Sequence, residues 1–474
     1  AGAHGPVAAA TAIVALAVAG NIVSRFIPRV DAGAPDLKID WNPWAESLAI
    51  LRLMRKQLAV RNAVLGVSWF WFVGTVLTAQ LPTYAETNLG GGATLYIFAL
   101  ALFSVGTGTG SVLCEKLSAR TVEIGLVPLG AFGMSAFLLD LYFARPGAAL
   151  ASGLDLAGFL RQPGSWRIVL DLTGIGLFAG FFVVPLFALI QSRTPKNELS
   201  RVIAALNIQN AGFIVLAAVL GIAVQLERVT LLGHTLPMPG WTIPQVFLAL
   251  AIANTLVAIR IFTIVPEFLM RFLSWILVNT LYRIRTEGLD HIPEEGPALL
   301  VCNHVSYMDA LILAATIPRP VRFVMYHRIF DIPVMNWIFR TARAIPIASP
   351  REDAALMERA FDAIDAALAE GEPVGIFPEG ALTKDGEIAA FKSGVEKILA
   401  RAAARGQVVP VVPMALRGMW RSMWSRRDSR LGRMRVPRRL RAHVEVAADA
   451  PVRDPAASAA QLEAKVRALR GDAA

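Results

Sequence analysis

The sequence predicts an α-helical membrane bundle of about seven spans, followed by an α/β domain. The chain has 474 residues, of which 55% are hydrophobic and only 17% are charged. A soluble protein carries roughly a quarter charged residues. The long apolar runs lie before residue 280, whereas most of the charged residues follow it. The two parts of the chain therefore face different surroundings.

Several apolar stretches reach the length of about 20 residues that a membrane-spanning helix needs. They are residues 7–27, 63–86, 94–114, 122–144, 166–192, 203–225 and 243–264. The first stretch has no basic residues before it and is followed by further spans, which argues against a cleaved signal peptide. We therefore assign residues 1–264 to a transmembrane domain.

Lysine and arginine residues are concentrated in alternate loops between the predicted spans. The first loop holds Arg29, Lys38, Arg52, Arg55, Lys56 and Arg61, and the second loop holds no basic residue. The third and fifth loops are again basic, although arginines in the fourth loop weaken the contrast. Because basic loops remain on the cytoplasmic side, we expect the N-terminus outside. The C-terminal domain is then expected at the cytoplasmic face of a bacterial inner membrane.

Residues 265–285 form an apolar stretch that is shorter than a span. Its polar residues are Glu267, Arg271, Asn279 and Arg283. An amphipathic helix lying in the membrane interface fits this pattern, with Trp275 and Tyr282 at the depth of the headgroups. The alternative is an eighth span, which would place the following domain on the outer side.

From residue 286 the pattern changes to that of a layered α/β domain, which we expect over 286–450. Short apolar runs that suit buried strands lie at 297–302, 373–377 and 407–412. Residues 354–370 have helical periodicity, and Gly371 follows them. Strands that alternate with helices are typical of an α/β fold. Residues 451–474 are expected to form a polar helix or tail.

Residues 303–309 read Asn-His-Val-Ser-Tyr-Met-Asp and follow the first predicted strand. Asp309 lies about one helical turn beyond His304, near enough to orient the imidazole. A histidine held in this way can take the proton from an alcohol. A lone pair of this kind is more often structural than catalytic, so the segment needs a second signal.

The second signal is Phe377-Pro-Glu-Gly380, which follows another predicted strand. By itself it could be an ordinary turn, because proline and glycine favour turns. The two motifs in this order resemble the glycerolipid acyltransferase family, which esterifies the hydroxyls of glycerol phosphate and lysophospholipids. The resemblance covers residues 284–420, with less specific matches at 342–347 and 409–416.

The resemblance implies direct acyl transfer from an acyl carrier protein or coenzyme A thioester to a lysophospholipid hydroxyl, with no cofactor or metal. It implies that His304 is the general base and that Asp309 orients it. The substrate-binding residues that it implies are Asn303, Ser306, Glu379, Gly380, Arg351, Lys384 and Lys392. Arg351 stands two residues beyond Ser349, where the family's usual Asp-Arg is replaced by Ala-Ser. A nucleophilic role for Ser306 remains an alternative.

The membrane part resembles the second half of a major facilitator transporter, in the lysophospholipid branch that is sometimes fused to an acyltransferase. A long basic loop precedes six predicted spans, and residues 110–120 resemble the family's glycine–acid–base loop. Asn207, Gln209 and Asn210 are expected to face the bundle interior, as substrate contacts or as links between helices. The alternative function is thus a lysophospholipid transporter with an accessory acyltransferase domain.

Two further expectations concern completeness and partners. Such transporters build their site between two six-helix halves, and one predicted span precedes the basic loop, so we expect a fragment or a chain without the first half. The net charge is +10, and arginines cluster at 421–441. Beside a membrane domain, this cluster indicates anionic membrane lipid rather than nucleic acid. The two cysteines match no disulfide framework and no metal site.

Overall fold

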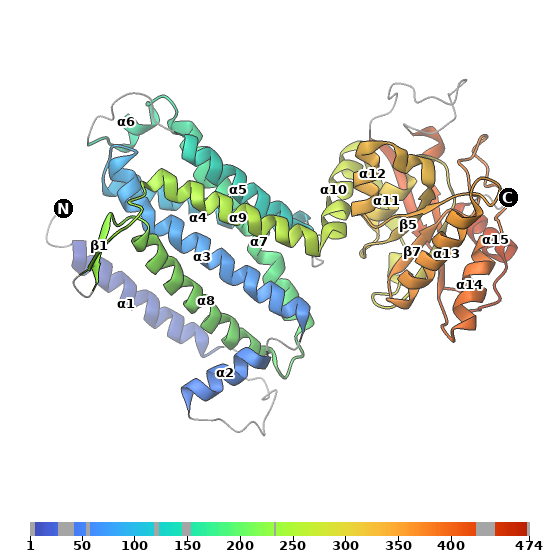
Figure 1. Cartoon of the computed structure of the whole chain (residues 1–474), viewed down its shortest axis with the longest axis horizontal. Helices are drawn as coiled ribbons and strands as arrows, with labels where there is room; N and C mark the ends of the chain where they lie inside the picture. Colours follow the sequence, from blue (N-terminus) through green and yellow to red (C-terminus); the bar gives the residue numbers. More distant parts are fainter. Residues whose placement is uncertain are drawn as a thin grey trace.

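The computed structural model describes residues 5–26, 42–53, 57–117, 123–144, 153–231, 234–422 and 441–471. Six helices in this part are long and apolar enough to cross a membrane. They are α3 (Leu58–Thr87), α4 (Ala93–Leu117), α5 (Leu126–Phe143), α7 (Ser165–Arg193), α8 (Leu199–Ala223) and α9 (Ile243–Ile264). Figure 1 shows this bundle and a separate α/β domain, joined through α10 (Pro266–Leu281). The chain is therefore a multi-pass membrane protein with an α/β domain.

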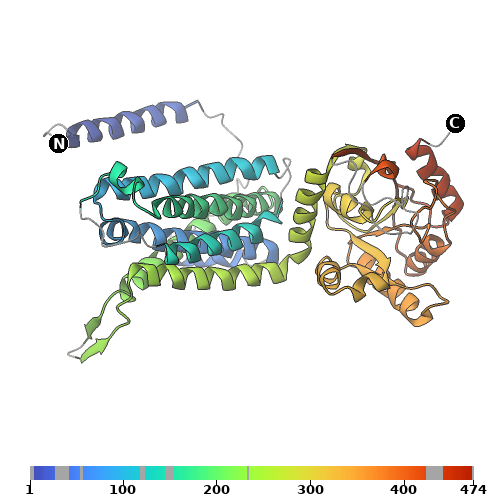
Figure 2. The same ribbon diagram turned by 90° about the horizontal axis from the view of Figure 1, so that it is seen from above.

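Six of the seven stretches predicted as spans form the long apolar helices of the bundle. The seventh stretch, predicted at 7–27, forms α1 (Gly5–Ser24), an apolar helix of 20 residues. Its described side chains are exposed, because α1 lies apart from the other helices, as Figure 2 shows. A hydrophobic run thus predicted a helix, but it did not predict whether that helix packs in the bundle.

Short elements connect the spans. They are α2 (Pro43–Leu53) before α3, α6 (Leu156–Leu160) before α7, and a hairpin between α8 and α9. The hairpin pairs β1 (Arg228–Leu231) with β2 (His234–Pro237) and projects beyond the helices in Figure 2. Half of the predicted basic loop at 28–61 and part of the predicted loop at 110–120 lie outside the described residues.

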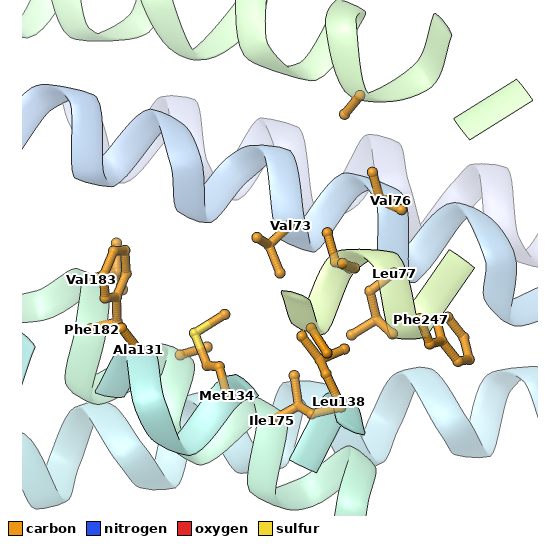
Figure 3. Packing of buried hydrophobic residues seen from close by; sticks show 14 of the residues in the cluster. Val73, Val76, Leu77, Ala131, Met134, Leu138, Ile175, Phe182, Val183 and Phe247 are labelled. Carbon is orange, nitrogen blue, oxygen red and sulfur yellow. The ribbon is translucent and has the colours of Figure 1, made fainter. Parts of the chain in front are cut away.

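Large apolar side chains from four helices fill the centre of the bundle. Figure 3 shows Val73, Val76 and Leu77 of α3, Ala131, Met134 and Leu138 of α5, Ile175, Phe182 and Val183 of α7, and Phe247 of α9. By contrast, α4 and α7 meet through glycines. A β-carbon at Gly106 or Gly110 would collide with the α7 backbone, and one at Gly176 or Gly180 with the α4 backbone. Small residues allow such close approach of membrane helices.

Of the three amides predicted to face the bundle interior, Asn210 does so fully, and the Nε2 atom of Gln209 is also buried. Asn210 is buried and hydrogen-bonded to Ser68 of α3 over 2.8 Å. Asn207 is exposed and Gln209 is half-buried. The interhelical bond of Asn210 fits its interpretation as a link between helices.

The α/β domain is built on a seven-stranded sheet in the order β3-β9-β8-β4-β7-β5-β6. The strands are β3 (Tyr282–Glu287), β4 (Ala298–Cys302), β5 (Arg322–Tyr326), β6 (Ile345–Ile347), β7 (Pro373–Ile376), β8 (Val411–Arg417) and β9 (Ala442–Ala448). β8 and β9 are antiparallel, and the other neighbours are parallel. The strand predicted at 407–412 corresponds to β8, which begins later than predicted, at Val411.

Helices cover both faces of this sheet. Leu299 and Val301 of β4 pack with α13 (Ala354–Ala369), α14 (Gly394–Ala404) and α15 (Ala459–Arg470). Leu300 and Cys302 point to the other face, toward α10 and α11 (Asp309–Thr316). Because both faces are covered, β4 is apolar throughout its length. The carboxyl ends of β4, β5, β6 and β7 lie at one edge, since these strands are parallel.

Candidate active site

His304 lies just beyond β4, and Asp309 begins α11. Asp309 Oδ2 lies 2.9 Å from His304 Nδ1, and it accepts hydrogen bonds from the backbone amides of Val305 (2.6 Å) and Ser306 (2.8 Å). Asp309 is fully buried, whereas 23% of the His304 side chain is exposed. When Nδ1 carries the proton toward the carboxylate, Nε2 presents a lone pair, as a general base requires.

An aromatic ring stacks on the His304 imidazole, and a second ring supports the first. Phe377 stacks on it at a centroid distance of 4.2 Å and an interplanar angle of 17°. Phe323 of β5 lies beyond Phe377, with the two ring centroids 6.3 Å apart. The sequence marks Phe377 only as part of a turn, and an apolar residue at the end of a strand gives no signal for this stacking.

Glu379 ties the turn after β7 to the histidine segment. It is buried, and its Oε1 accepts the His304 amide hydrogen over 2.7 Å, while its Oε2 accepts that of Ala389 over 2.8 Å. The Thr383 amide in turn donates to the His304 carbonyl over 3.0 Å. Burial raises the pKa of the Glu379 carboxyl, and the two amide bonds oppose this rise. The carboxylate therefore holds the backbone on both sides of the site.

Gly380 and Lys392 lie together beside this turn. Gly380 has a φ of +69°, in the left-handed region that favours glycine. A β-carbon here would also collide with the end of the Lys392 side chain. The Lys392 amide donates to the Pro378 carbonyl over 3.0 Å, which fixes the backbone of this lysine at the turn.

The other two predicted cations lie further along their loops. Lys384 is exposed in the loop after β7, and Arg351 is exposed between β6 and α13. Arg351 follows the sheet's edge strand, two positions from β7 in the sheet order. Among the described residues, no hydrogen bond or ion pair is seen between either cation and His304, Asp309 or Glu379.

Asn303 and Ser306 are fully buried within the site. The Asn303 side chain accepts from the Leu416 amide (2.8 Å) and donates to the Leu416 carbonyl (3.1 Å), which joins the end of β4 to β8. The Ser306 hydroxyl accepts from the Met308 amide over 3.2 Å. Both side chains therefore hold the loop that carries His304.

In the part of the chain that the structure describes, neither the cysteines nor the possible metal ligands form a second centre. Both cysteines are buried free thiols, and burial raises the pKa of Cys302, next to the histidine segment, well above its ordinary value. Within the described ranges, no group of three or more His, Cys, Asp or Glu side chains could hold a metal ion. Nearly all of the predicted arginine cluster at 421–441 falls outside the described residues.

A family model described as Acyltransferase matches residues 283–417. The C-terminal domain is an acyltransferase domain. It contains both motifs and the sheet edge where they meet. This acyltransferase domain is similar to a chloroplastic 1-acyl-sn-glycerol-3-phosphate acyltransferase of Arabidopsis thaliana. The two sequences are 30% identical over 160 residues, which cover 33% of this chain and 42% of the plant protein.

Two further relatives cover other shares of the chain. A lysophospholipid transporter of Cronobacter sakazakii is 27% identical over 225 residues, which are 47% of this chain and 52% of the transporter. The crystal structure of a 1-acyl-sn-glycerophosphate acyltransferase from Thermotoga maritima is 19% identical, with a TM-score of 0.32. The match covers 44% of this chain and 81% of the Thermotoga maritima chain. The chain thus spans about half the length of the curated relatives it matches.

Proposed function

We propose that this protein is a membrane-bound O-acyltransferase that moves a fatty acyl group to the free hydroxyl of a lysophospholipid. The observation that carries the proposal is the contact between His304 Nδ1 and the buried Asp309 carboxylate, at 2.9 Å. The acyl donor is a preformed thioester of acyl carrier protein or coenzyme A. The match of the acyltransferase family to residues 283–417 supports the same chemistry.

In the proposed reaction, His304 Nε2 accepts the proton of the lysophospholipid hydroxyl as the oxygen attacks the thioester carbonyl. Asp309 stabilises the imidazolium that forms, because it is the carboxylate at Nδ1. The carbon–sulfur bond of the tetrahedral intermediate then breaks, and the leaving thiolate takes the proton from His304. Backbone amides of the turn after β7 are the proposed donors to the oxyanion.

The cations of neighbouring loops are the proposed ligands of the acceptor's phosphate. Lys392 is the first choice, because its side chain lies beside Gly380 at the turn that Glu379 connects to His304. Lys384 and Arg351 are exposed in loops at the same edge of the sheet and reach the phosphate in the proposed complex. Asn303 and Ser306 act on the substrate through the backbone of the histidine loop, which their buried side chains hold.

We place the acyltransferase domain at the cytoplasmic face of a bacterial inner membrane, with α10 lying in the interface. The distribution of basic loops supports this orientation. Figures 1 and 2 both draw α10 at a steep angle to the spans, at the end of the bundle. Leu273, Ile276 and Leu277 leave one side of α10 exposed and apolar, which suits contact with lipid.

The direct test is acyl transfer by the whole protein in lipid vesicles. Labelled acyl carrier protein or coenzyme A thioesters would be offered with lysophosphatidate or lysophosphatidylethanolamine. His304→Ala should lower kcat by about 10²–10⁴-fold, the usual contribution of a general base. His443→Ala, an exposed histidine of β9, should keep activity. Absence of acylation by the wild type with every pair of donor and acceptor would contradict the proposal.

The similarity to lysophospholipid transporters favours a second candidate function, lysophospholipid movement across the bilayer. Fluorescent lysophosphatidylethanolamine would be followed from the outer to the inner leaflet of vesicles that contain the protein. Transport at an unchanged rate in His304→Ala would support a transport function independent of acyl transfer. Equal rates in vesicles with and without the protein would exclude it for this chain.

A further inference from the structure

A short helix between β5 and β6 leaves apolar side chains exposed beside the active-site edge. This helix is α12 (Pro333–Thr341), preceded by the 3-10 helix η2 (His327–Asp331). Its inner side is fixed to η2, because Phe339 packs on Phe330 and the Asn336 side chain donates from Nδ2 to the Phe330 carbonyl over 2.7 Å. On its outer side, Trp337 is 57% exposed, and Ile332 directly before the helix is 54% exposed.

The outer side of α12 adjoins the end of a membrane span. Trp337 stacks on Phe262, in the last turn of α9, with ring centroids 6.4 Å apart and planes at 26°. Figure 1 shows α12 next to α10, on the part of the domain nearest to the bundle. The apolar surface of the last span therefore continues onto α12. Tryptophan is enriched at the level where membrane helices leave the hydrocarbon region.

Cationic side chains flank this apolar surface. Arg340 is exposed on α12, where its Nε donates to Asn336 over 2.6 Å. Arg328 of η2 is also exposed, and the carboxylate nearest to it is Glu352 at 3.7 Å, an ion pair that solvent weakens. An amphipathic helix with aromatic residues on one side and arginines around them suits an anionic lipid surface.

The same helix stands close to the catalytic edge. η2 and α12 follow the carboxyl end of β5, and His304 follows the carboxyl end of the parallel strand β4. Tyr307, three residues after His304, is 49% exposed. A lipid surface that contacts α12 thus lies at the edge of the sheet where both substrates must enter.

We infer that α12 is an interfacial helix, which docks through Ile332 and Trp337 on the anionic surface of the bilayer beside the end of α9. The partner is lipid rather than protein, because the apolar side chains continue the surface of a span and are flanked by arginines. Docking at this point fixes the open edge of the sheet at headgroup depth. Its test does not require the protein to be an active acyltransferase.

The experiment measures the depth of a spin label at residue 332 in the whole protein, in nanodiscs of phosphatidylethanolamine and phosphatidylglycerol. Ile332→Cys retains Trp337, and the native cysteines Cys114 and Cys302 are buried, so the label goes to the new site. The control is Val408→Cys. Val408 is an equally exposed apolar residue before β8, at the opposite edge of the sheet.

A nitroxide at residue 332 should relax more with oxygen than with a water-soluble nickel chelate, whereas one at residue 408 should show the reverse. Equal accessibility at the two sites would overturn the inference. The ratio of oxygen to nickel accessibility at residue 332 should also rise with the fraction of phosphatidylglycerol. Arg328→Ser with Arg340→Ser should abolish this rise. A ratio that ignores lipid charge in both proteins would refute docking on an anionic surface.

Discussion

One carboxylate oxygen organises the chemistry proposed for His304. Oδ2 of Asp309 faces the imidazole Nδ1 and two successive backbone amides, and the whole side chain is buried. These donors hold the loop in a single conformation around a negative charge. An asparagine at this position would keep the shape but lose the charge that stabilises an imidazolium. The role of Asp309 can therefore be separated from the packing of its loop.

Asp309→Asn should lower kcat for acyl transfer by about 10²–10⁴-fold, with a much smaller change in KM. The measurement is initial-rate kinetics with a varied lysophosphatidate concentration in vesicles. Asp290→Asn, at an exposed position of the 3-10 helix after β3, is the matched control and should retain wild-type rates. A fully active Asp309→Asn enzyme would remove the general base pair from the mechanism.

Glu379 gives a prediction about pH. Burial raises the pKa of its carboxyl above the ordinary value of 4.5, so the folded chain retains this proton where the unfolded chain has lost it. The contribution of Glu379 to stability must therefore fall as the pH rises through this window. In thermal unfolding from about pH 5 to about pH 8, wild type should lose stability relative to Glu379→Gln. If wild type instead gained stability relative to Glu379→Gln as the pH rose, the two amide bonds would lower the pKa of Glu379 by more than burial raises it.

At the scale of single residues, the sequence predicts the members of the site better than their partners. The short spacing of His304 and Asp309 predicts their contact, but the two residues are not one helical turn apart: His304 lies in the loop after β4, and Asp309 begins α11. The amide donors to Asp309 and Glu379 leave no pattern in the sequence, since every residue carries a backbone amide. Asn303 belongs to the recognised motif, but its bonds to Leu416 depend on how β4 and β8 are paired.

Among the elements, the C-terminal helix α15 fastens the loop that follows Glu379. Glu463 accepts the Phe391 amide hydrogen over 3.0 Å, and Arg467 donates to the Ile388 carbonyl. Arg470 donates to the Gly386 carbonyl over 2.8 Å and pairs with Glu387 at 3.1 Å. This loop also carries Lys384 and ends at Lys392, so α15 controls where those cations stand.

Arg470→Ala should raise KM for lysophosphatidate roughly 5–10-fold, which corresponds to about 1–1.4 kcal/mol, while kcat changes little. The expected size follows from losing charge-assisted bonds that position a loop without touching the reacting atoms. Lys465→Ala on the same helix removes an exposed pair with Asp449 at 3.4 Å and serves as the control. Equal KM values for the two variants would show that α15 does not position the loop.

The elements themselves were largely predictable from apolar patterns. Six spans and the strands β4 and β7 match their predicted stretches closely, because each is a continuous apolar run. β8 was placed too early, since its apolar run begins at Val408, before the chain reaches β4. The contacts of α15 were not predictable, because they join residues about eighty positions apart in the chain.

For the molecule as a whole, Arg271 of α10 connects the bundle with the acyltransferase domain. It pairs with Glu123, two residues before Gly125 at the start of α5, and donates to the Ile317 carbonyl over 2.9 Å. Ile317 follows α11, the helix that begins with Asp309. Both charged side chains are about nine-tenths buried, and burial lowers the pKa of Arg271 to about 10. The sequence marks Arg271 only as an interruption of an apolar stretch.

Glu123→Gln should destabilise the whole protein by about 3–5 kcal/mol, because it leaves a buried guanidinium without its carboxylate. Glu123→Leu with Arg271→Met should recover much of this loss, since the uncompensated charge is then absent. Thermal unfolding in detergent micelles would measure both. Glu295→Gln is the control, because its pair with Arg193 also joins the two parts at 3.2 Å but is exposed. Similar losses in both single variants would argue against a special role for Arg271.

The glycine contacts between α4 and α7 have a consequence for movement in the bundle. Helices slide past each other when interlocked side chains change rotamer, whereas backbones that touch have no such freedom. Gly106 and Gly110 face Gly176 and Gly180, so we expect this pair of helices to move as a single rigid unit. Any rearrangement that admits a lipid to the bundle must therefore separate other helices, while α4 and α7 move together as one rigid body.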